Sequence, residues 1–210
     1  MPRNKARRSV VPLGCVDHGA LLRALVRDAV LVAADDFTSY DVSYPEFLKY
    51  FNSCGPLTNH HLIIATNFAY GWMPTILDFA SREFEKGVAY LEIAKAGGKL
   101  SIAELTTLAK IVNNSTVGAS KLLHFASPSA YAILDSRVAK YLRARIESGD
   151  RAAEQYLAYN DCMRELSDSR EAVEVAGKMS DRVGYDVGQM RALELVMFHA
   201  GELAGHIWAT

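Results

Sequence analysis

The helical spacing of apolar residues is the sequence feature that most constrains the fold. Between residues 20 and 33, apolar pairs alternate with polar residues, as at Leu21, Leu22, Leu25 and Val26. Such spacing places the apolar side chains on one face of a helix. No convincing run rich in valine, isoleucine and threonine shows the alternation of a strand. We therefore predict an all-α fold, a compact domain of about ten helices with short connections.

Length and apolar content indicate one domain. The chain has 210 residues, of which 50% are hydrophobic, and this is sufficient for a sizeable core. Residues 1–15 are rich in arginine and lysine, which predicts a flexible basic tail. The Gly97-Gly98 pair is a break between helical segments. We expect a helical subdomain at 16–98 and a second at 99–210, within a single domain spanning 1–210.

The spacing of the cysteines and the length of the apolar runs indicate the cellular compartment. Cys15, Cys54 and Cys162 are widely separated and have no metal-binding spacing, which fits a reducing compartment. The apolar stretches are too short to span a bilayer, and the basic start is not followed by a clean signal core. We expect a cytoplasmic protein with no membrane partner, no metal and no cofactor.

The overall charge does not by itself indicate a nucleic-acid-binding protein. The formal net charge is −1, whereas many specialised DNA-binding domains are strongly basic. A nearly neutral chain can still carry a local positive face, because whole-chain charge averages over the surface.

A helix, a turn and a second helix are predicted in the middle of the chain. The Ser101-x-x-Glu104 capping box opens a helix that should reach about Val112. A polar turn over 113–118 follows, and then a helix over 119–125. Lys121 would lie in the first turn of that helix, where the helix dipole disfavours a cation.

An aspartate follows this pair of helices. After Pro128, a short apolar stretch leads to Asp135, which is followed by a helical pattern and would cap that helix. The arrangement over residues 108–141 resembles the helix-hairpin-helix superfamily of DNA glycosylases. That resemblance implies that Lys121 is the nucleophile attacking C1′ of the target nucleotide. It also implies that Asp135 assists loss of the base.

The same resemblance implies a set of DNA contacts. In the family, backbone N–H groups of the hairpin hold a DNA phosphate, as helix N-termini favour anions. The corresponding backbone here belongs to Asn114, Ser115, Thr116 and Gly118. Two basic side chains after the aspartate, those of Arg137 and Lys140, are further phosphate contacts or solvated surface residues.

Two departures from the family leave the chemistry open. The usual leucine-proline-glycine-valine-glycine hairpin is replaced by the longer 112–118 segment, which lacks the proline and the first glycine. The interval from Lys121 to Asp135 is also shorter than in familiar members, so Ser120 could stand opposite the family lysine. With Lys121, a lyase activity would accompany base excision; with Ser120, Asp135 and water would act alone. The cysteine cluster that binds iron–sulfur in some relatives is absent.

Aromatic residues supply candidates for a base pocket. A flipped base is sandwiched between aromatic or apolar side chains, and Tyr70 and Trp72 flank a glycine. His124 and Phe125 lie about one turn after Lys121. Each of these residues has an equally simple interpretation as part of the core.

The leading hypothesis is a DNA glycosylase acting on double-stranded DNA. Relatives with a catalytic lysine act on oxidised purines, so the resemblance implies oxidised guanine first. The altered hairpin leaves room for another damaged or hypermodified base, including those of phage DNA. The rival hypothesis is a helical protein- or DNA-binding module without catalysis.

Overall fold

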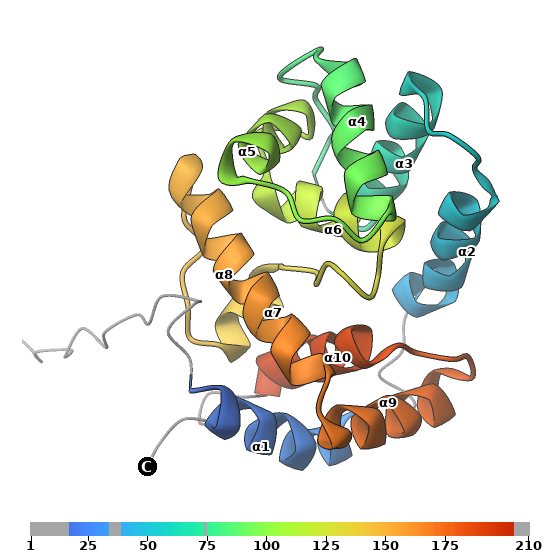
Figure 1. Ribbon diagram of the computed structural model, residues 1–210. Helices are drawn as coiled ribbons and strands as arrows, with labels where there is room; N and C mark the ends of the chain where they lie inside the picture. The colour runs from blue at the N-terminus through green and yellow to red at the C-terminus, as the bar shows by residue number, and fades with distance from the viewer. Residues whose placement is uncertain (1–16, 34–38, 74, 204–210) are drawn as a thin grey trace, which may run out of the picture.

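Helices α6 and α7 lie between two groups of helices (Figure 1). The computed structural model describes residues 17–33, 39–73 and 75–203. Within these ranges the chain is all-helical and has no strand, as predicted. The elements are α1 (His18–Asp28), the 3-10 helix η1 (Ala29–Leu31), α2 (Ser39–Ser53), α3 (Asn59–Gly71), α4 (Phe84–Lys95), α5 (Ile102–Ile111), α6 (Thr116–Ala126), α7 (Ser136–Tyr141), α8 (Asp150–Ser167), α9 (Arg170–Val183) and α10 (Gln189–Leu203).

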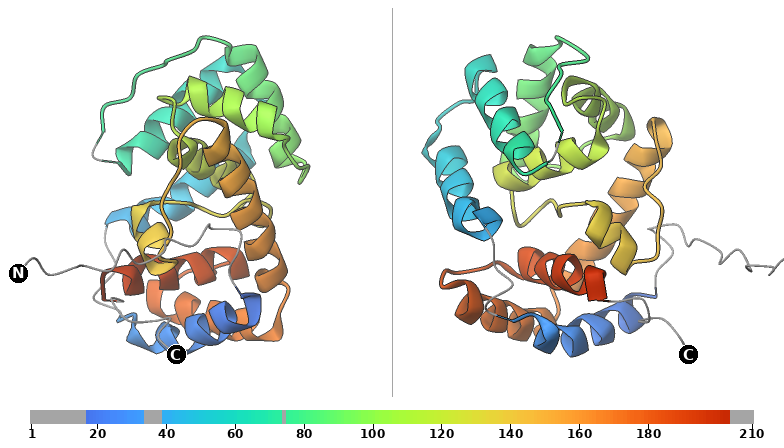
Figure 2. Two further views of the ribbon diagram at one scale, coloured as in Figure 1. Left: turned by 90° about the vertical axis from the view of Figure 1, so that its left-hand side faces the viewer. Right: turned by 180° about the vertical axis from the view of Figure 1, so that it is seen from behind.

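One group comes from the middle of the sequence, and the other combines its two ends. Helices α3 and α4 pack against α5 and α6, whereas α1 packs against α9 and α10, and α7 packs along α10. Helix α8 contacts α5 and α6 on one side and α1, α9 and α10 on the other (Figures 1 and 2). Helices from the predicted parts 16–98 and 99–210 therefore meet in each group. The predicted basic tail, 1–15, lies outside the described residues.

Several helix ends follow directly from local sequence. The Ser101–Glu104 capping box is formed, with each residue bonding the backbone of the other. Asp135 caps α7 as predicted, and its Oδ1 accepts from the backbone N–H groups of Arg137 and Val138 at 2.9 Å each. Such caps satisfy N–H groups that have no partner within the helix.

The sequence pattern predicts a helix capped by Ser43, a helix from 75 to about 86 and a helix from 135 to about 147, and each of these bounds is wrong for an identifiable reason. Ser43 does not start α2, which begins earlier, at Ser39; its hydroxyl instead donates back to the Ser39 carbonyl. The helix expected from residue 75 is absent, and α4 begins only at Phe84. The apolar residues that suggested it do not form a buried face, since Ile76 is 90% exposed. Helix α7 ends at Tyr141 rather than near 147, because Arg143 adopts a left-handed conformation with φ 52°.

The connection between α5 and α6 is tighter than predicted. It spans 112–115, and both Asn113 and Asn114 have positive φ, a conformation that asparagine tolerates well. Helix α6 therefore starts at Thr116, capped by the Ser115 hydroxyl, which accepts from Gly118 N–H at 3.0 Å. The predicted first-turn position of Lys121 is wrong, and the lysine lies in the second turn.

No helix in the described ranges is both long and apolar enough to cross a membrane. Cys54 and Cys162 are free thiols.

A glycine controls how closely α10 approaches α7. A Cβ placed on Gly201 would lie 2.5 Å from the backbone oxygen of Arg137. We therefore expect Gly201→Ala to lower the free energy of unfolding by about 1–3 kcal/mol in chemical denaturation, because a backbone carbonyl cannot move aside easily. Gly177→Ala, in the open on α9, is the matched control and should raise stability by up to about 1 kcal/mol. Equal effects of the two substitutions would contradict this account of the α7–α10 contact.

Candidate functional site

A cavity of about 390 Å³ lies where α2, α3, α6, α7 and α10 converge. This is within the usual size range of small-molecule sites. The residues on its wall come from segments far apart in the sequence: Tyr40, Asp41, Trp72, Met73, Thr75, Val117, Lys121, Ile133, Asp135, Ser136, Arg137, Ile146, Arg191, Glu194 and Phe198. The cavity thus combines aromatic and apolar surface with six charged side chains.

Lys121 and Asp135 lie on the wall of this one cavity. Lys121 is only 5% exposed, although its side chain carries a charge. Its Nζ lies 3.4 Å from the carbonyl oxygen of Trp72 and 6.0 Å from the centre of that ring. Within the described part of the chain no carboxylate lies within ion-pair distance of this amine. Lys121 is therefore a buried amine that faces the cavity without a paired anion.

Burial also changes the acid–base properties of Lys121. It lowers the pKa of the ammonium group, because an apolar environment disfavours the charged form. The nearby carboxylates of Asp135 and Glu194 oppose this shift without reversing it. A lowered pKa increases the fraction of neutral amine, which is the nucleophilic form.

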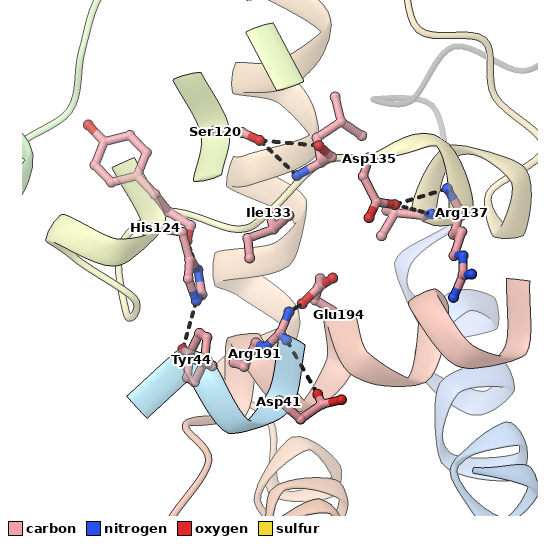
Figure 3. Close-up of polar contacts among 12 residues, drawn as sticks. Asp41, Tyr44, Ser120, His124, Ile133, Asp135, Arg137, Arg191 and Glu194 are labelled. Atoms are coloured by element: carbon pink, nitrogen blue, oxygen red, sulfur yellow. Dashed lines mark hydrogen bonds and ion pairs between the residues drawn. The ribbon is translucent and has the colours of Figure 1, made fainter. Parts of the chain in front are cut away.

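Asp135 is held rigidly and remains available to the cavity. Its Oδ1 accepts two backbone hydrogen bonds at the start of α7, as described above. No described residue donates a hydrogen bond to its Oδ2, and the side chain lies on the cavity wall (Figure 3). One carboxylate oxygen therefore fixes the group, and the other can face a ligand.

The stretch before Asp135 is held in place by α8. The hydroxyl groups of Tyr156 and Tyr159 donate to the carbonyls of Ala132 and Ile133 at 2.9 and 3.0 Å. Asn160 bonds the same stretch through both ends of its amide, accepting from Ala132 N–H at 2.7 Å. We refer to these three α8 side chains as the α8 clamp. The clamp binds four polar groups of the 130–133 backbone, so a helix later in the chain helps to position Asp135.

Ser120 does not share the position of Lys121. Its hydroxyl is buried and accepts from Leu134 N–H at 3.1 Å, and its one proton lies within reach of the carbonyls of Val117, at 2.8 Å, and Leu134, at 3.2 Å. It ties α6 to the stretch before Asp135 and is absent from the cavity wall. Of the two neighbours weighed from the sequence, only Lys121 faces the cavity.

Among the aromatic candidates, Trp72 lines the cavity and the others do not. Trp72 is half-buried, and its Nε1–H donates to Ser43 Oγ at 2.8 Å. Phe125 packs edge-on against Trp72 from the core side, with ring centres 5.0 Å apart. Tyr70 is buried and donates to the Val112 carbonyl. The sequence did not single out Tyr40, which lines the cavity and packs against Trp72 at 5.8 Å.

His124 is fully buried away from the cavity wall. Its Nε2 lies 2.8 Å from Tyr44 Oη, and its Nδ1 lies 2.6 Å from the Tyr131 carbonyl oxygen (Figure 3). Burial lowers the pKa of His124 to about 3, with the positive charge of Arg191 as a second cause. The imidazole is therefore neutral at physiological pH and belongs to the core.

This buried imidazole makes the protein sensitive to acid. Between about pH 6.5 and 3, the unfolded chain binds a proton at His124 that the folded chain does not bind, so stability falls as pH falls. We expect the free energy of unfolding to depend on pH more steeply than in His124→Gln, by about 1.4 kcal/mol per pH unit between pH 6 and 4. Denaturant titrations at each pH measure this difference. Parallel pH profiles for the two proteins would contradict a neutral His124.

The predicted phosphate contacts lie in two separate parts of the structure. Asn114, Ser115, Thr116 and Gly118 form the α5–α6 turn and the start of α6, outside the cavity wall. Of these, Gly118 packs closely, because a Cβ on it would meet Val112 and Tyr70 at about 3 Å. Arg137 lies on the cavity wall, with its guanidinium 4.4 Å from the ring centre of Phe198. Lys140 is exposed on α7 and does not line the cavity.

Sequence reasoning missed the charged residues that α2 and α10 bring to the cavity. Arg191 and Glu194 form an ion pair, and Arg191 Nη2 lies 3.9 Å from Asp41 Oδ1 (Figure 3). Burial raises the pKa of Glu194 to about 7; the nearby Asp135 contributes to this rise, whereas Arg191 opposes it. The signal was present, since Arg191 and Glu194 interrupt an apolar helix at a spacing that places them on one face.

Comparison with protein-family models, curated proteins and solved structures finds no match for the chain. No group of three or more potential metal-binding side chains occurs among the residues described. The geometry of the cavity is therefore the basis for assigning a function to the protein.

Proposed function

We propose that the protein is a DNA glycosylase that excises a damaged or modified base within this cavity. The observation that supports it best is that two side chains face the same cavity: a buried lysine with no ion pair to a described carboxylate, and an aspartate held by its role as the cap of α7. These are the two residues that resemble the catalytic pair of helix-hairpin-helix glycosylases. Trp72 adds an aromatic wall against which an extruded base can stack.

The two side chains are suited to breaking an N-glycosidic bond. As the bond breaks, its electron pair leaves with the base, which takes up a proton, and positive charge develops on the sugar. The carboxylate of Asp135 stabilises that charge. The neutral amine of Lys121 then forms a bond to C1′ and releases a proton, which yields a covalent intermediate and a route to strand cleavage.

The proposed DNA contacts flank the lysine–aspartate pair in the sequence. The α5–α6 turn and the start of α6 precede Lys121, and the backbone over 113–118 would hold a phosphate. Arg137 and Lys140 follow Asp135 and would contact the flanking backbone. Phosphate contacts fix the position of a protein along the duplex but carry little information about base sequence.

Base release from defined duplexes tests the proposal. We expect one base to be released from a panel carrying oxidised, deaminated, alkylated or phage-type modified bases, as detected by mass spectrometry. Borohydride should trap a covalent adduct between the enzyme and that duplex. Lys121→Gln should abolish the adduct, because it removes the amine, whereas Lys178→Gln, which replaces an exposed lysine on α9, should retain it.

The outcomes separate the proposal from its rivals. An adduct that persists in Lys121→Gln would overturn the role of this lysine while leaving glycosylase activity in place. Salt-dependent duplex binding without release of any base would indicate a DNA-binding module. Absence of both would indicate a helical module with a different partner.

A further inference from the structure

Arg191, Glu194 and Asp41 form a buried charged cluster in the cavity wall, which we call the polar floor. The exposed fractions of their side chains are only 5%, 1% and 7%. Asp41 comes from α2, whereas the other two come from α10. None of the three is part of the lysine–aspartate pair, so the proposed chemistry leaves their presence unexplained.

Stability does not explain the polar floor. Replacing a buried ion pair with apolar residues is often neutral or stabilising, because both charges lose their hydration. Arg191 is also the third residue of α10, where the helix dipole favours anions over cations. A buried residue that conflicts with its local environment in two ways is characteristic of a functional site.

The guanidinium in the polar floor has hydrogen-bond donors that its two carboxylates do not use. Nη1 of Arg191 bonds Glu194, but Nη2 is 3.9 Å from Asp41, which exceeds hydrogen-bond length. The buried Nε has no partner among the described residues. The guanidinium is also held in place by two aromatic rings, with Cζ 4.6 Å from the centre of Tyr44 and 5.6 Å from that of Trp72. A positioned guanidinium with unused N–H groups favours a ligand that supplies an acceptor.

We propose that Arg191 is the specificity-determining residue of the cavity and selects bases that carry a ring carbonyl group. This inference rests on the proposed function for the nature of the ligand. The guanidinium donates to the carbonyl oxygen of the base, and Glu194 accepts from the adjacent ring N–H. A base with an amino group in place of the carbonyl presents a donor to Arg191, which has no acceptor to offer. The cavity therefore prefers oxo bases to amino bases, among purines and pyrimidines alike.

Free bases test this selection without any excision. Hypoxanthine and adenine differ in an oxo or an amino group at one position, and uracil and cytosine form the same kind of pair. Binding is read from Trp72 emission in a Trp208→Phe background, since the chain has two tryptophans. Free N-acetyltryptophanamide corrects for absorption by the bases. We expect each oxo base to bind about tenfold more tightly than its amino partner.

Two variants test whether Arg191 is responsible for the preference for oxo bases. The double substitution Arg191→Met with Glu194→Leu removes both partners of the close ion pair together, which avoids a buried Glu194 without its cation, and it should abolish the oxo preference. Arg191→Lys keeps the charge but loses the planar pair of donors, and it should reduce the preference. A preference that survives the double substitution, oxo and amino bases that bind equally, or no binding of the oxo bases at millimolar concentration would each overturn the inference.

Selective binding of free bases tests the role of Arg191, and base release from a duplex tests the glycosylase activity, so the two can be refuted independently. Oxo-selective binding without base release from any duplex would leave the polar floor as a recognition site and refute the glycosylase. Base release together with equal binding of oxo and amino bases would leave the glycosylase and refute the role of Arg191.

Discussion

Asp135→Asn is expected to slow base release by about 10²–10³-fold and to leave the fold intact. Asparagine retains a side-chain oxygen that can accept from Arg137 N–H and Val138 N–H, and it is as good a helix cap as aspartate. What it lacks is the negative charge that, in the proposed reaction, would stabilise the sugar cation. Single-turnover base release and denaturant unfolding, measured on the same protein, give the two quantities.

Matched variants separate the charge from the cap. Asp135→Ala removes both, so it should lose the same activity and about 1 kcal/mol of stability in addition. Ser169→Ala removes a cap of the same kind at the start of α9, where Ser169 accepts from Ala172 N–H. It should lose similar stability with normal base release. A rate for Asp135→Asn within a few-fold of wild type would reduce Asp135 to a helix cap.

Arg191→Met alone is expected to cost about 3–5 kcal/mol of unfolding free energy, because it leaves Glu194 buried without its partner. Glu194→Leu alone should be similarly costly, since it leaves Asp41, at 3.9 Å, as the carboxylate nearest the guanidinium among the described residues. The double substitution should recover most of the loss, because it removes both partners of the close ion pair, and what remains should reflect Asp41 losing the guanidinium. Denaturant titrations of the four proteins form a thermodynamic cycle with a large coupling energy.

The result of this cycle shows whether folding requires the Arg191–Glu194 ion pair. Additive losses of stability would mean that the two charges do not act as a pair, contrary to the geometry. Near-complete recovery in the double variant would mean that folding does not require the pair. The ion pair would then be explained by ligand binding, as the polar floor proposes.

The fold was predictable where local chemistry decides it. The Ser101–Glu104 capping box and the Asp135 cap are formed, since side chain and backbone partners lie within a few residues of each other. Prediction was wrong where apolar residues were assumed to face a core, as at Ile76, which is almost wholly exposed. It was also wrong at Arg143, whose left-handed backbone ends α7 without a glycine to signal it.

The candidate site was predictable in part. Lys121, Asp135, Trp72 and Arg137 line one cavity, but nothing in the sequence placed the first pair beside α10. The positions of Arg191 and Glu194 depend on long-range packing of α10 against α7, which sequence spacing does not encode. Tyr70 and His124 were aromatic candidates of equal merit from the sequence. Burial alone distinguishes them from Trp72.

The α8 clamp has a consequence for how this chemistry could be inherited or engineered. The segment that resembles a glycosylase ends before α8 begins, yet Tyr156, Tyr159 and Asn160 determine the path of the backbone that presents Asp135. The segment is consequently not a portable module. Grafted onto another helical scaffold, it would retain its cap and its turn but lose the alignment of its carboxylate with the lysine. Any ancestor or design that shares this chemistry has to carry the later helix with it.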